Sequence, residues 1–328
     1  MAKLSVDAYV RGIERGDRAL LARAITLVES EQPRHAALGQ EVLERLLPRT
    51  GRASRVGVSG VPGVGKSTFI DALGMHLIEQ GHRVAALTLD PSSTVTGGSI
   101  LGDKTRMTRL SREADAYIRP SPTGGTLGGV GRKTRETMLL CEAFGFDVVI
   151  VETVGVGQSE TVVAEMVDFY LVLMLAGAGD ELQGIKRGIL EVADMLAINK
   201  ADGDNRVAAK RARSDYAAAL KLMHRGQRGW KPPVLMCSAL HDEGLDAIWE
   251  KVQEHRAQLS GSGALQARRA DQAVRWMWRI VEDALSQALR RHPDVRARLG
   301  ALERDVREGR ATASAAARQI LDAFGAGA

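Results

Sequence analysis

The sequence predicts an α/β fold in which a mostly parallel central sheet is flanked by helices, with helical extensions at both ends of the chain. From residue 55 onward, short runs rich in β-branched residues alternate with helical stretches, which is the pattern of a parallel sheet covered by helices. Apolar residues at helical spacing in residues 5–47, and again from 245 onward, predict the two extensions. The candidate strands are 55–59, 83–89, 147–151, 169–175, 194–198 and 233–237.

These patterns divide the chain into three regions. We expect an N-terminal helical extension over residues 1–52, an α/β domain over 53–258 and a C-terminal helical arm over 259–328. The helix expected at 272–290 carries two apolar stripes, a face wide enough to pack against more than one neighbour. Both packing within the chain and a subunit interface remain open for this face.

Composition and charge restrict the classes of partner. With 328 residues, of which 45% are hydrophobic, the chain can build a substantial core. The net charge is +5, but acidic residues are interleaved with the arginines between 267 and 310, which favours a solvated helical surface over a nucleic-acid-binding patch. The longest apolar runs, such as 169–176, are too short to span a bilayer, so no membrane partner is expected. The N-terminus has no apolar segment typical of a signal peptide, and we expect a cytoplasmic protein.

Residues 60–68, GVPGVGKST, stand between a candidate strand and a candidate helix and match the pattern G-x-x-x-x-G-K-[ST]. In the phosphate-binding loop of P-loop NTPases, glycines let backbone N–H groups point at the β-phosphate, the lysine reaches the β- and γ-phosphate oxygens, and the hydroxyl ligates Mg²⁺. The sequence therefore predicts a P-loop, with Lys66 also a candidate catalytic residue and Ser67 a candidate magnesium ligand. The nucleotide-binding residues expected here are Gly60, Gly63, Val64, Gly65, Lys66, Ser67 and Thr68.

Two further segments predict that the base is guanine, and hence that the ligands are GTP and GDP. The sequence NKAD, residues 199–202, ends a candidate strand, so that Asn199, Lys200 and Asp202 are candidate base-binding residues. A carboxylate at Asp202 accepts hydrogen bonds from guanine N1–H and N2–H₂, whereas adenine presents an acceptor at N1 and would leave it unpaired. The Lys200 stem can lie on the base. The segment CSAL, 237–240, ends another strand, where a backbone N–H near Ser238 and Ala239 would meet the base oxygen.

A carboxylate also ends the apolar run at 148–151. Glu152 is followed by Gly155, the spacing of the D-x-x-G motif of P-loop GTPases, in which the acid binds Mg²⁺ or its waters and the glycine N–H senses the γ-phosphate. A bound cation would compensate the burial of this charge. Asp90 and Asp103 are further candidates to complete the Mg²⁺ site or, for Asp90 as a catalytic residue, to position water.

Hydrolysis by the chain alone is expected to be slow. Small GTPases often carry a glutamine after D-x-x-G to orient the attacking water, and here that residue is Val156. The glycine-rich segment 176–188 follows a candidate strand, and loops at the carboxyl end of parallel strands face the ligand. Gln183 and Lys186 in this segment are candidate catalytic residues, although an ordinary surface loop that opens a helix also fits the pattern.

Together these motifs resemble the methylmalonyl-CoA mutase-associated GTPases, the MeaB/ArgK type of P-loop GTPase. The resemblance is carried by the blocks GVPGVGKST, DPSS, TGGSILGDKTRM, RPSPTGGTLGGV, ETVGVGQSE, GAGDELQGIKRGILE, NKAD and WMW. It implies a magnesium-dependent GTPase that dimerises through its C-terminal helices. It also implies a chaperone of an adenosylcobalamin-dependent acyl-CoA mutase, which gates cofactor loading and protects the mutase. By motif position, it implies a magnesium site formed by Ser67, Asp90, Asp103 and Glu152, and a switch at 176–188.

Two alternatives stay open at this point. A metal-insertion GTPase that serves nickel enzymes would carry clustered Cys and His ligands, but the seven histidines are scattered and Cys141 and Cys237 stand alone. A small-molecule kinase would use the same P-loop, but it would need an acceptor pocket, and NKAD argues against ATP. The motifs leave open which client is served: methylmalonyl-CoA, ethylmalonyl-CoA or isobutyryl-CoA mutase.

Overall fold

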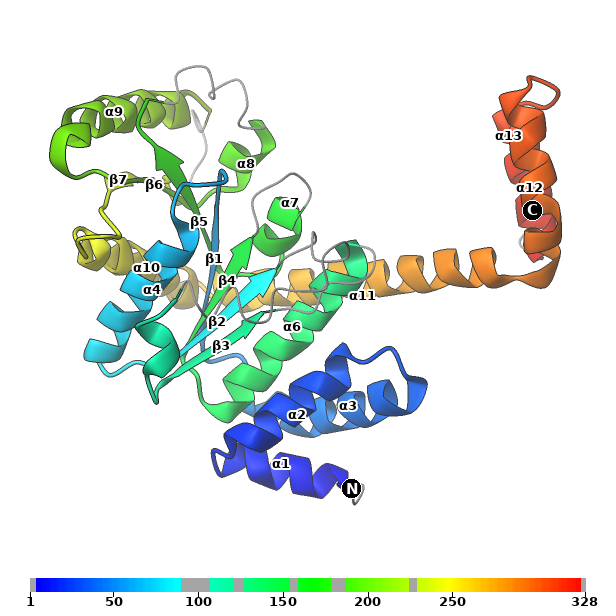
Figure 1. Cartoon of the computed structure of the whole chain (residues 1–328), viewed down its shortest axis with the longest axis horizontal. Helices are drawn as coiled ribbons and strands as arrows, with labels where there is room; N and C mark the ends of the chain where they lie inside the picture. Colours follow the sequence, from blue (N-terminus) through cyan, green and yellow to red (C-terminus); the bar gives the residue numbers. More distant parts are fainter. Residues whose placement is uncertain are drawn as a thin grey trace. The chain divides into compact units, whose positions relative to one another are not determined.

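A parallel sheet forms the centre of the structure, a computed structural model that describes residues 4–89, 107–120, 127–153, 159–177, 187–223 and 229–325. Seven strands pair in parallel throughout, in the order β3-β2-β4-β1-β5-β6-β7. Their bounds are β1 (Ser54–Gly60), β2 (Val84–Leu89), β3 (Ala116–Pro120), β4 (Val148–Thr153), β5 (Phe169–Leu175), β6 (Met195–Asn199) and β7 (Val234–Met236). The predicted α/β fold with a parallel sheet is therefore confirmed (Figure 1).

One strand was not predicted from the sequence. The strand β3 reads AYIRP and lies at the edge of the sheet, where only its alternate residues are buried. An edge strand needs neither a continuous apolar run nor a backbone N–H at every position, so Pro120 is tolerated there. The six predicted strands are the others. Five of them, β1, β2, β4, β5 and β6, have apolar runs that reflect burial on both faces of the sheet, and β7 is a half-buried strand at the opposite edge.

Helices cover both faces of this sheet, because neighbouring residues of each strand point to opposite sides. Val148 and Ile150 share a core with α4 and α10, whereas Val149 and Val151 share another with α6 and α9. Figure 1 shows α4 and α10 on one face and α6 and α7 on the other. The helices of this part are α4 (Lys66–Glu79), α6 (Leu127–Phe144), α7 (Ser159–Ala164), α8 (Arg187–Val192), α9 (Arg206–Met223) and α10 (Leu245–Gly261).

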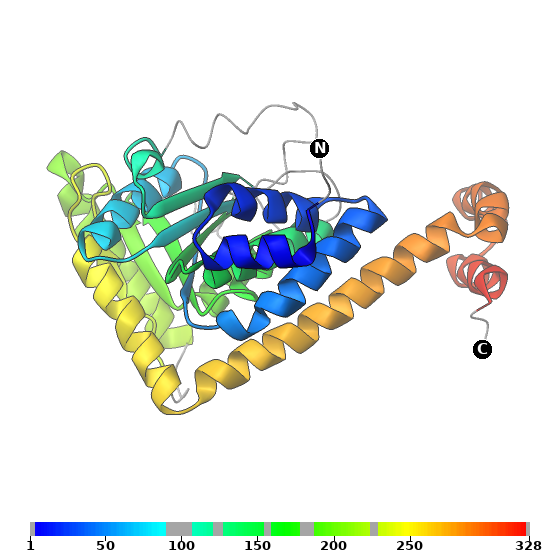
Figure 2. The same cartoon turned by 90° about the horizontal axis from the view of Figure 1, so that it is seen from below.

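The N-terminal extension forms three helices, α1 (Val6–Glu14), α2 (Arg18–Glu29) and α3 (Pro33–Leu46), which pack on one another and on α6 (Figure 2). Charged side chains tie α2 to the edge strand. The Arg18 guanidinium donates to the carbonyl oxygens of Ala114 and Ala116, and Arg119 of β3 pairs with the buried Glu29. The extension thus covers α6 and is fastened to β3.

The chain forms two compact units, Met1–Gln272 and Ala273–Ala328, and the helix α11 (Ala264–Arg291) belongs to both. The second unit also holds α12 (Pro293–Arg307) and α13 (Ala313–Phe324), which bury Val295, Leu302 and Ala316. The three regions predicted from the sequence, with boundaries at 52/53 and 258/259, stay a prediction.

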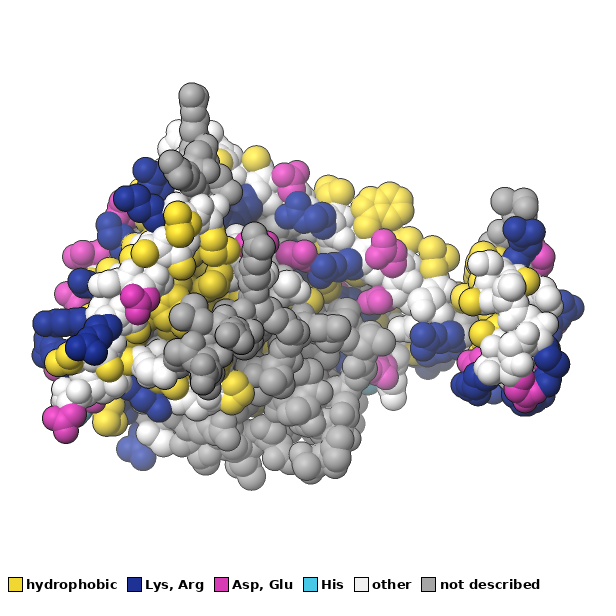
Figure 3. All heavy atoms as spheres, turned by 90° about the horizontal axis from the view of Figure 1, so that it is seen from above, with side chains coloured by type: hydrophobic (Ala, Val, Ile, Leu, Met, Phe, Trp, Pro, Cys, Tyr) yellow, Lys and Arg dark blue, Asp and Glu magenta, His cyan; other side chains and the backbone are white. Residues whose placement is uncertain are grey.

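Hydrophobic side chains of α11 are exposed within the second unit. In Figure 3, yellow side chains stand out on the described surface, where dark blue and magenta ones are interspersed. The exposed hydrophobic residues of α11 are Val274, Met277, Trp278, Ile280, Val281 and Leu285. Among the helices that the structure describes, none combines the length and the hydropathy needed to cross a bilayer.

Candidate guanine-nucleotide site

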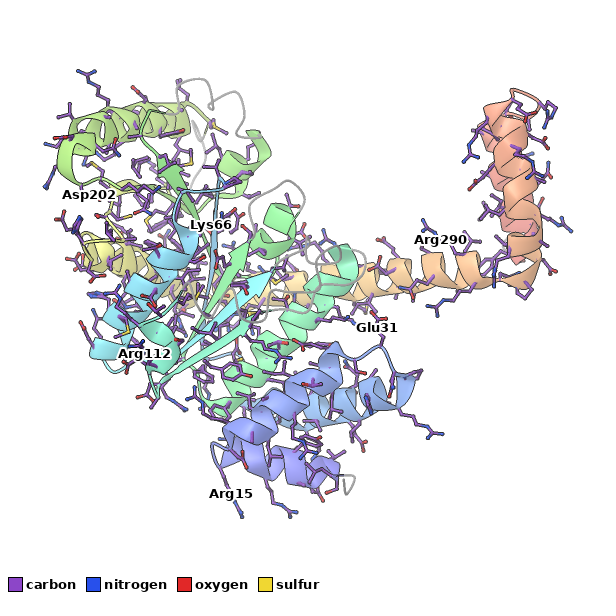
Figure 4. All side chains as sticks on the ribbon, viewed as in Figure 1. Arg15, Glu31, Lys66, Arg112, Asp202 and Arg290 are labelled. Atoms are coloured by element: carbon purple, nitrogen blue, oxygen red, sulfur yellow. The ribbon has the colours of Figure 1, made fainter. Side chains whose placement is uncertain are left out.

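The predicted motifs converge at one edge of the sheet, because the carboxyl ends of parallel strands meet there. The P-loop follows β1, Glu152 lies near the end of β4, and Asn199 ends β6. In the register of the sheet, Val58 lies beside Glu152 and Leu175 beside Asn199. Figure 4 labels Lys66, at the start of α4, and Asp202, beyond the end of β6.

Two glycines allow the P-loop to take its shape. Gly60 has φ 148°, and a Cβ atom there would stand 2.5 Å from the carbonyl oxygen of Leu173 in β5. Gly65 has φ 93° and lies directly before the first residue of α4, where a Cβ atom would meet the Asn199 side chain at 3.0 Å. No side chain caps the start of α4. The backbone N–H groups of its first turn are therefore suited to binding an anion.

Lys66 lies over this loop. Its ammonium group donates hydrogen bonds to the carbonyl oxygens of Gly60, at 2.8 Å, and Val61, at 3.2 Å. The side chain is buried, so its charge acts in a site that is only partly screened by water. This position suits a cation that stabilises phosphate oxygens.

Ser67 and Glu152 meet at the predicted metal position. The Ser67 hydroxyl donates to Glu152 Oε1 at 3.0 Å, and Glu152 is 5% exposed. A hydroxyl and a carboxylate are hard oxygen ligands of the kind that Mg²⁺ prefers, so this pair fits the implied ion. Next to it, Thr153 Oγ1 donates to Ser59 Oγ at 2.9 Å and joins the ends of β4 and β1. The other predicted metal, catalytic and phosphate-sensing residues, Asp90, Asp103, Gly155, Gln183 and Lys186, lie outside the described residues.

Asn199 connects the phosphate loop to the base-binding loop. Its amide nitrogen donates to the carbonyl oxygen of Val64 at 2.8 Å, and its amide oxygen accepts from the backbone N–H of Ala239 at 3.1 Å. The side chain is 1% exposed. A buried amide that is hydrogen-bonded to both loops fixes the distance between them, because moving either loop would leave a buried polar group unpaired.

The neighbours of Asn199 complete the base-binding residues. Lys200 has φ 56°, a conformation in which its ammonium group donates to the carbonyl oxygen of Gly63 at 2.9 Å. The Ser238 hydroxyl donates to Asp202 Oδ2. Asp202 is half-buried, with a serine already in place to orient its carboxylate. Such an oriented acceptor is suited to reading the N1–H and N2–H₂ edge of guanine.

The sequence analysis missed some of these connections. The Thr153–Ser59 hydrogen bond joins residues 94 positions apart, and the two links made by Asn199 join residues 135 and 40 positions apart. A polar residue next to a motif acid, as Thr153 is next to Glu152, is the one local sign that could have suggested the first of them.

The two cysteines are buried thiols. Burial raises the pKa of Cys237 to about 12 and raises the pKa of Cys141 as well. Both are therefore protonated at neutral pH, a state that does not ligate metals. The part of the chain that the structure describes holds no group of three or more His, Cys, Asp and Glu side chains placed to bind a metal ion.

Comparisons with known proteins agree on one family. The family model described as methylmalonyl Co-A mutase-associated GTPase MeaB matches residues 21–294. A putative GTPase of Caulobacter vibrioides is 57% identical, over 98% of each chain. GTPase ArgK of Escherichia coli is 53% identical, over 84% of this chain and 83% of that protein. The mitochondrial methylmalonic aciduria type A homolog of Mus musculus is 47% identical, over 97% of this chain and 79% of that protein. The crystal structure of an LAO/AO transport system kinase superposes with a TM-score of 0.79 at 40% identity, and the match covers 98% of both chains.

Proposed function

Because the chain belongs to the methylmalonyl Co-A mutase-associated GTPase family, we propose that it uses GTP to chaperone an adenosylcobalamin-dependent acyl-CoA mutase. The family resemblance predicted from the motifs is confirmed, and GTP hydrolysis is the activity that this family and its relatives are named for. The link to methylmalonyl-CoA mutase is likewise in the family's description. The proposal adds that GTP binding and hydrolysis gate the loading of the mutase's cofactor and protect the mutase from inactivation.

The observation that carries the nucleotide part of this proposal is the pair of hydrogen bonds made by Asn199. They tie Val64 of the P-loop to Ala239 of the base loop. The phosphates and the base of one ligand can therefore be held at once, with Asp202 as the reader of guanine. This arrangement favours a GTPase over a small-molecule kinase that uses ATP.

Each residue then has a role in hydrolysis, in which water attacks the γ-phosphorus and the bond to the β-phosphate oxygen breaks. The Lys66 ammonium stabilises the charge that develops on the phosphate oxygens. Ser67 and Glu152 would hold Mg²⁺, which neutralises charge on the β- and γ-phosphates when it is bound. Asp90 and Asp103 remain proposed members of this site. Asp202 and Ser238 hold the base, so that the γ-phosphate is presented at the start of α4.

The segment 176–188 is proposed as the switch that senses the partner. Val156 cannot orient water, so turnover without the partner should be low, on the order of 10⁻⁴–10⁻² s⁻¹ for an unassisted GTPase. The mutase would accelerate hydrolysis by placing Gln183 against the nucleophile or Lys186 against the γ-phosphate. Lys186→Ala should then keep the basal rate and lose most of the stimulation. Stimulation that survives in both Lys186→Ala and Gln183→Ala would exclude this role.

We also propose that the protein is cytoplasmic and that it forms a homodimer. The homodimer is supported by the exposed hydrophobic side chains on α11, which a second copy of the helix would cover. Light scattering on the purified chain tests the oligomeric state directly. A monomer at all concentrations would exclude the homodimer.

Purification from the native cell tests the function as a whole. An adenosylcobalamin-dependent mutase should accompany the chain in the presence of a guanine nucleotide, and the mutase alone should lose activity faster during turnover than the mixture. A nickel enzyme in its place would favour the metal-insertion alternative. A phosphorylated small-molecule acceptor would favour a kinase.

A further inference from the structure

Arg109 lies between two carboxylates that belong to different parts of the nucleotide site. Its Nε donates to Asp71 Oδ2 at 2.9 Å, and its two terminal nitrogens donate to the two oxygens of Asp242 at 2.8 and 3.0 Å. Asp71 lies on α4, the helix that begins at Lys66, and Asp242 lies on the loop that contains Ser238 and Ala239. One guanidinium therefore joins the helix behind the phosphate loop to the base-binding loop.

The α4 side of this link is rigid. The Asp71 carboxylate is buried and accepts a second hydrogen bond, from the backbone N–H of Leu110 at 2.9 Å. Leu110 is itself fully buried, and it lies so close to Gly74 of α4 that a Cβ atom there would stand 2.6 Å from its side chain. The backbone beside Arg109 is thus held by the buried hydrogen bond and the packing of Leu110, and Arg109 itself donates to the same Asp71 carboxylate.

The base of this loop is held by its own contacts, because Ser238 and Ala239 are buried and the Ala239 N–H donates to Asn199. The tip of the loop has fewer such contacts within the described residues. Residues 237–243 are closed at their base by mutual backbone hydrogen bonds between Ser238 and Glu243, both at 3.0 Å. At the tip, Leu240 is 74% exposed and therefore adds no core packing. Asp242 has φ 54°, a left-handed conformation that Asp adopts more readily than most residues other than glycine. The bidentate pair with Arg109 fixes the tip of the loop.

We propose that Arg109 is a positioning residue for guanine recognition, because through Asp242 it holds the base loop, and with it the Ser238–Asp202 contact, against α4. This inference rests on the proposed guanine-binding function. Ser238 must stand at one place to orient the Asp202 carboxylate, and the contact of Arg109 with the loop tip adds to the backbone hydrogen bonds with Glu243 that hold Ser238. Without the Arg109 contact, the Asp202 carboxylate would be oriented less firmly and would read the guanine edge less selectively.

The Arg109–Asp242 pair fixes the position of the base loop and contributes little to the stability of the fold. Both side chains are about half exposed, and ion pairs of this kind contribute little to the stability of a fold because water screens them. The hydrogen bonds from Arg109 lower the pKa of Asp242, so this carboxylate stays charged at neutral pH. Asp242 is the residue to change, because removal of Arg109 would also strand the buried charge of Asp71.

Binding of GDP and inosine diphosphate to the full chain, measured by calorimetry with Mg²⁺, tests the inference. Inosine lacks the exocyclic N2 amino group, so it offers Asp202 one hydrogen bond where guanine offers two. Wild type should prefer GDP, and Asp242→Ala should reduce the ratio of the two dissociation constants by about three- to tenfold, as expected when one oriented hydrogen bond is lost. Asp242→Asn, which keeps an acceptor for Arg109, should retain part of the preference.

Asp305→Ala is the matched control, because Asp305 is a part-exposed carboxylate that pairs with Arg310 in the other compact unit. It should leave the ratio unchanged, and thermal unfolding of all variants should stay close to wild type. If Asp242→Ala keeps the wild-type ratio, or weakens both ligands equally, Arg109 has no role in reading the base. If wild type itself binds both diphosphates equally, the proposed reading of guanine by Asp202 fails first.

Discussion

The Ser67 hydroxyl donates a 3.0 Å hydrogen bond to Glu152 Oε1 and so joins the first turn of α4 to the end of β4. These two residues are 85 positions apart in the chain, yet the parallel pairing of β1 with β4 brings them together at the edge where the P-loop begins. A buried carboxylate next to a helix start that lacks a side-chain cap is a site for a cation and a phosphate together.

Glu152→Gln should weaken Mg²⁺ binding while the fold remains. The amide has the size of the carboxylate and can still accept from Ser67, but it carries no charge to balance the ion. We expect the Mg²⁺ concentration for half-maximal GTP hydrolysis to rise by roughly 10- to 100-fold. Asp147→Asn, which changes a carboxylate just before the opposite end of β4, is the control. A Mg²⁺ dependence equal to that of wild type would remove Glu152 from the metal site.

Asp202→Asn should exchange guanine for xanthine. The asparagine side chain can donate to the C2 carbonyl of xanthine, while it loses one of the acceptors that guanine needs. The affinity for GDP should fall about ten- to a hundredfold, and xanthosine diphosphate should bind more tightly than it does to wild type. The exposed Asp204, two residues further on, provides Asp204→Asn as the control. Equal affinity of wild type for ADP and GDP would contradict the assignment of Asp202.

Lys66→Ala should abolish hydrolysis without unfolding the sheet. The Lys66 ammonium contacts carbonyl oxygens of its own loop, so its loss removes charge from the site and takes no side chain out of the apolar core. Single-turnover hydrolysis should slow by at least about 10²-fold, the effect of removing one preorganised charged group from a phosphate site. Circular dichroism and Lys221→Ala, an exposed lysine of α9, control for folding. Hydrolysis at the wild-type rate in the folded variant would mean that 60–68 is not the catalytic loop.

The central strands could be predicted because burial on both faces leaves a continuous apolar run, as in residues 148–151 of β4. The edge strand β3 could not, because its sequence AYIRP needs apolar residues on one side alone. The helical extensions followed from spacing in the same way. Residues 5–47 form α1 to α3, and the glycines near 261–263 separate α10 from α11.

For the site, residues in short motifs could be predicted from the sequence, whereas contacts between distant residues could not. Lys66, Ser67 and Asp202 lie in short motifs whose spacing reflects the local backbone around a phosphate or a base. The contact between Arg109 and Asp242 joins residues 133 positions apart and leaves no local pattern. Asp71, the other residue that Arg109 contacts, has no sequence feature that distinguishes it from other acidic residues of helices. Its role follows from the structure, in which it accepts from Leu110 and Leu110 packs against Gly74. Such contacts depend on how loops from separate strands pack, and one sequence does not encode that packing as a motif.

A buried ion pair at the other end of the sheet should be needed for stability. Arg55 of β1 donates through Nε to Glu142 Oε1 at 2.5 Å, with side chains 5% and 1% exposed, and the second Glu142 oxygen accepts from the backbone N–H of Gly51 at 2.5 Å. Arg55→Met would leave the Glu142 charge buried without its cation, which costs about 3–5 kcal/mol. Equilibrium unfolding in urea should show this loss. Arg310→Met, which breaks the exposed pairs of Arg310 with Asp305 and Glu308, should cost less than about 1 kcal/mol.

The double variant Arg55→Met/Glu142→Gln distinguishes two causes of instability: the lost attraction between Arg55 and Glu142, and the burial of an unpaired Glu142 charge. The glutamine keeps an acceptor for Gly51 but carries no charge, so most of the loss caused by Arg55→Met should be recovered if the stranded charge is its cause. GDP binding at the opposite edge of the sheet should remain close to wild type in the folded fraction. A double variant that is as unstable as Arg55→Met would show that the loss comes from the missing guanidinium and its hydrogen bond, because the guanidinium is missing from both variants and the stranded charge is present in only one.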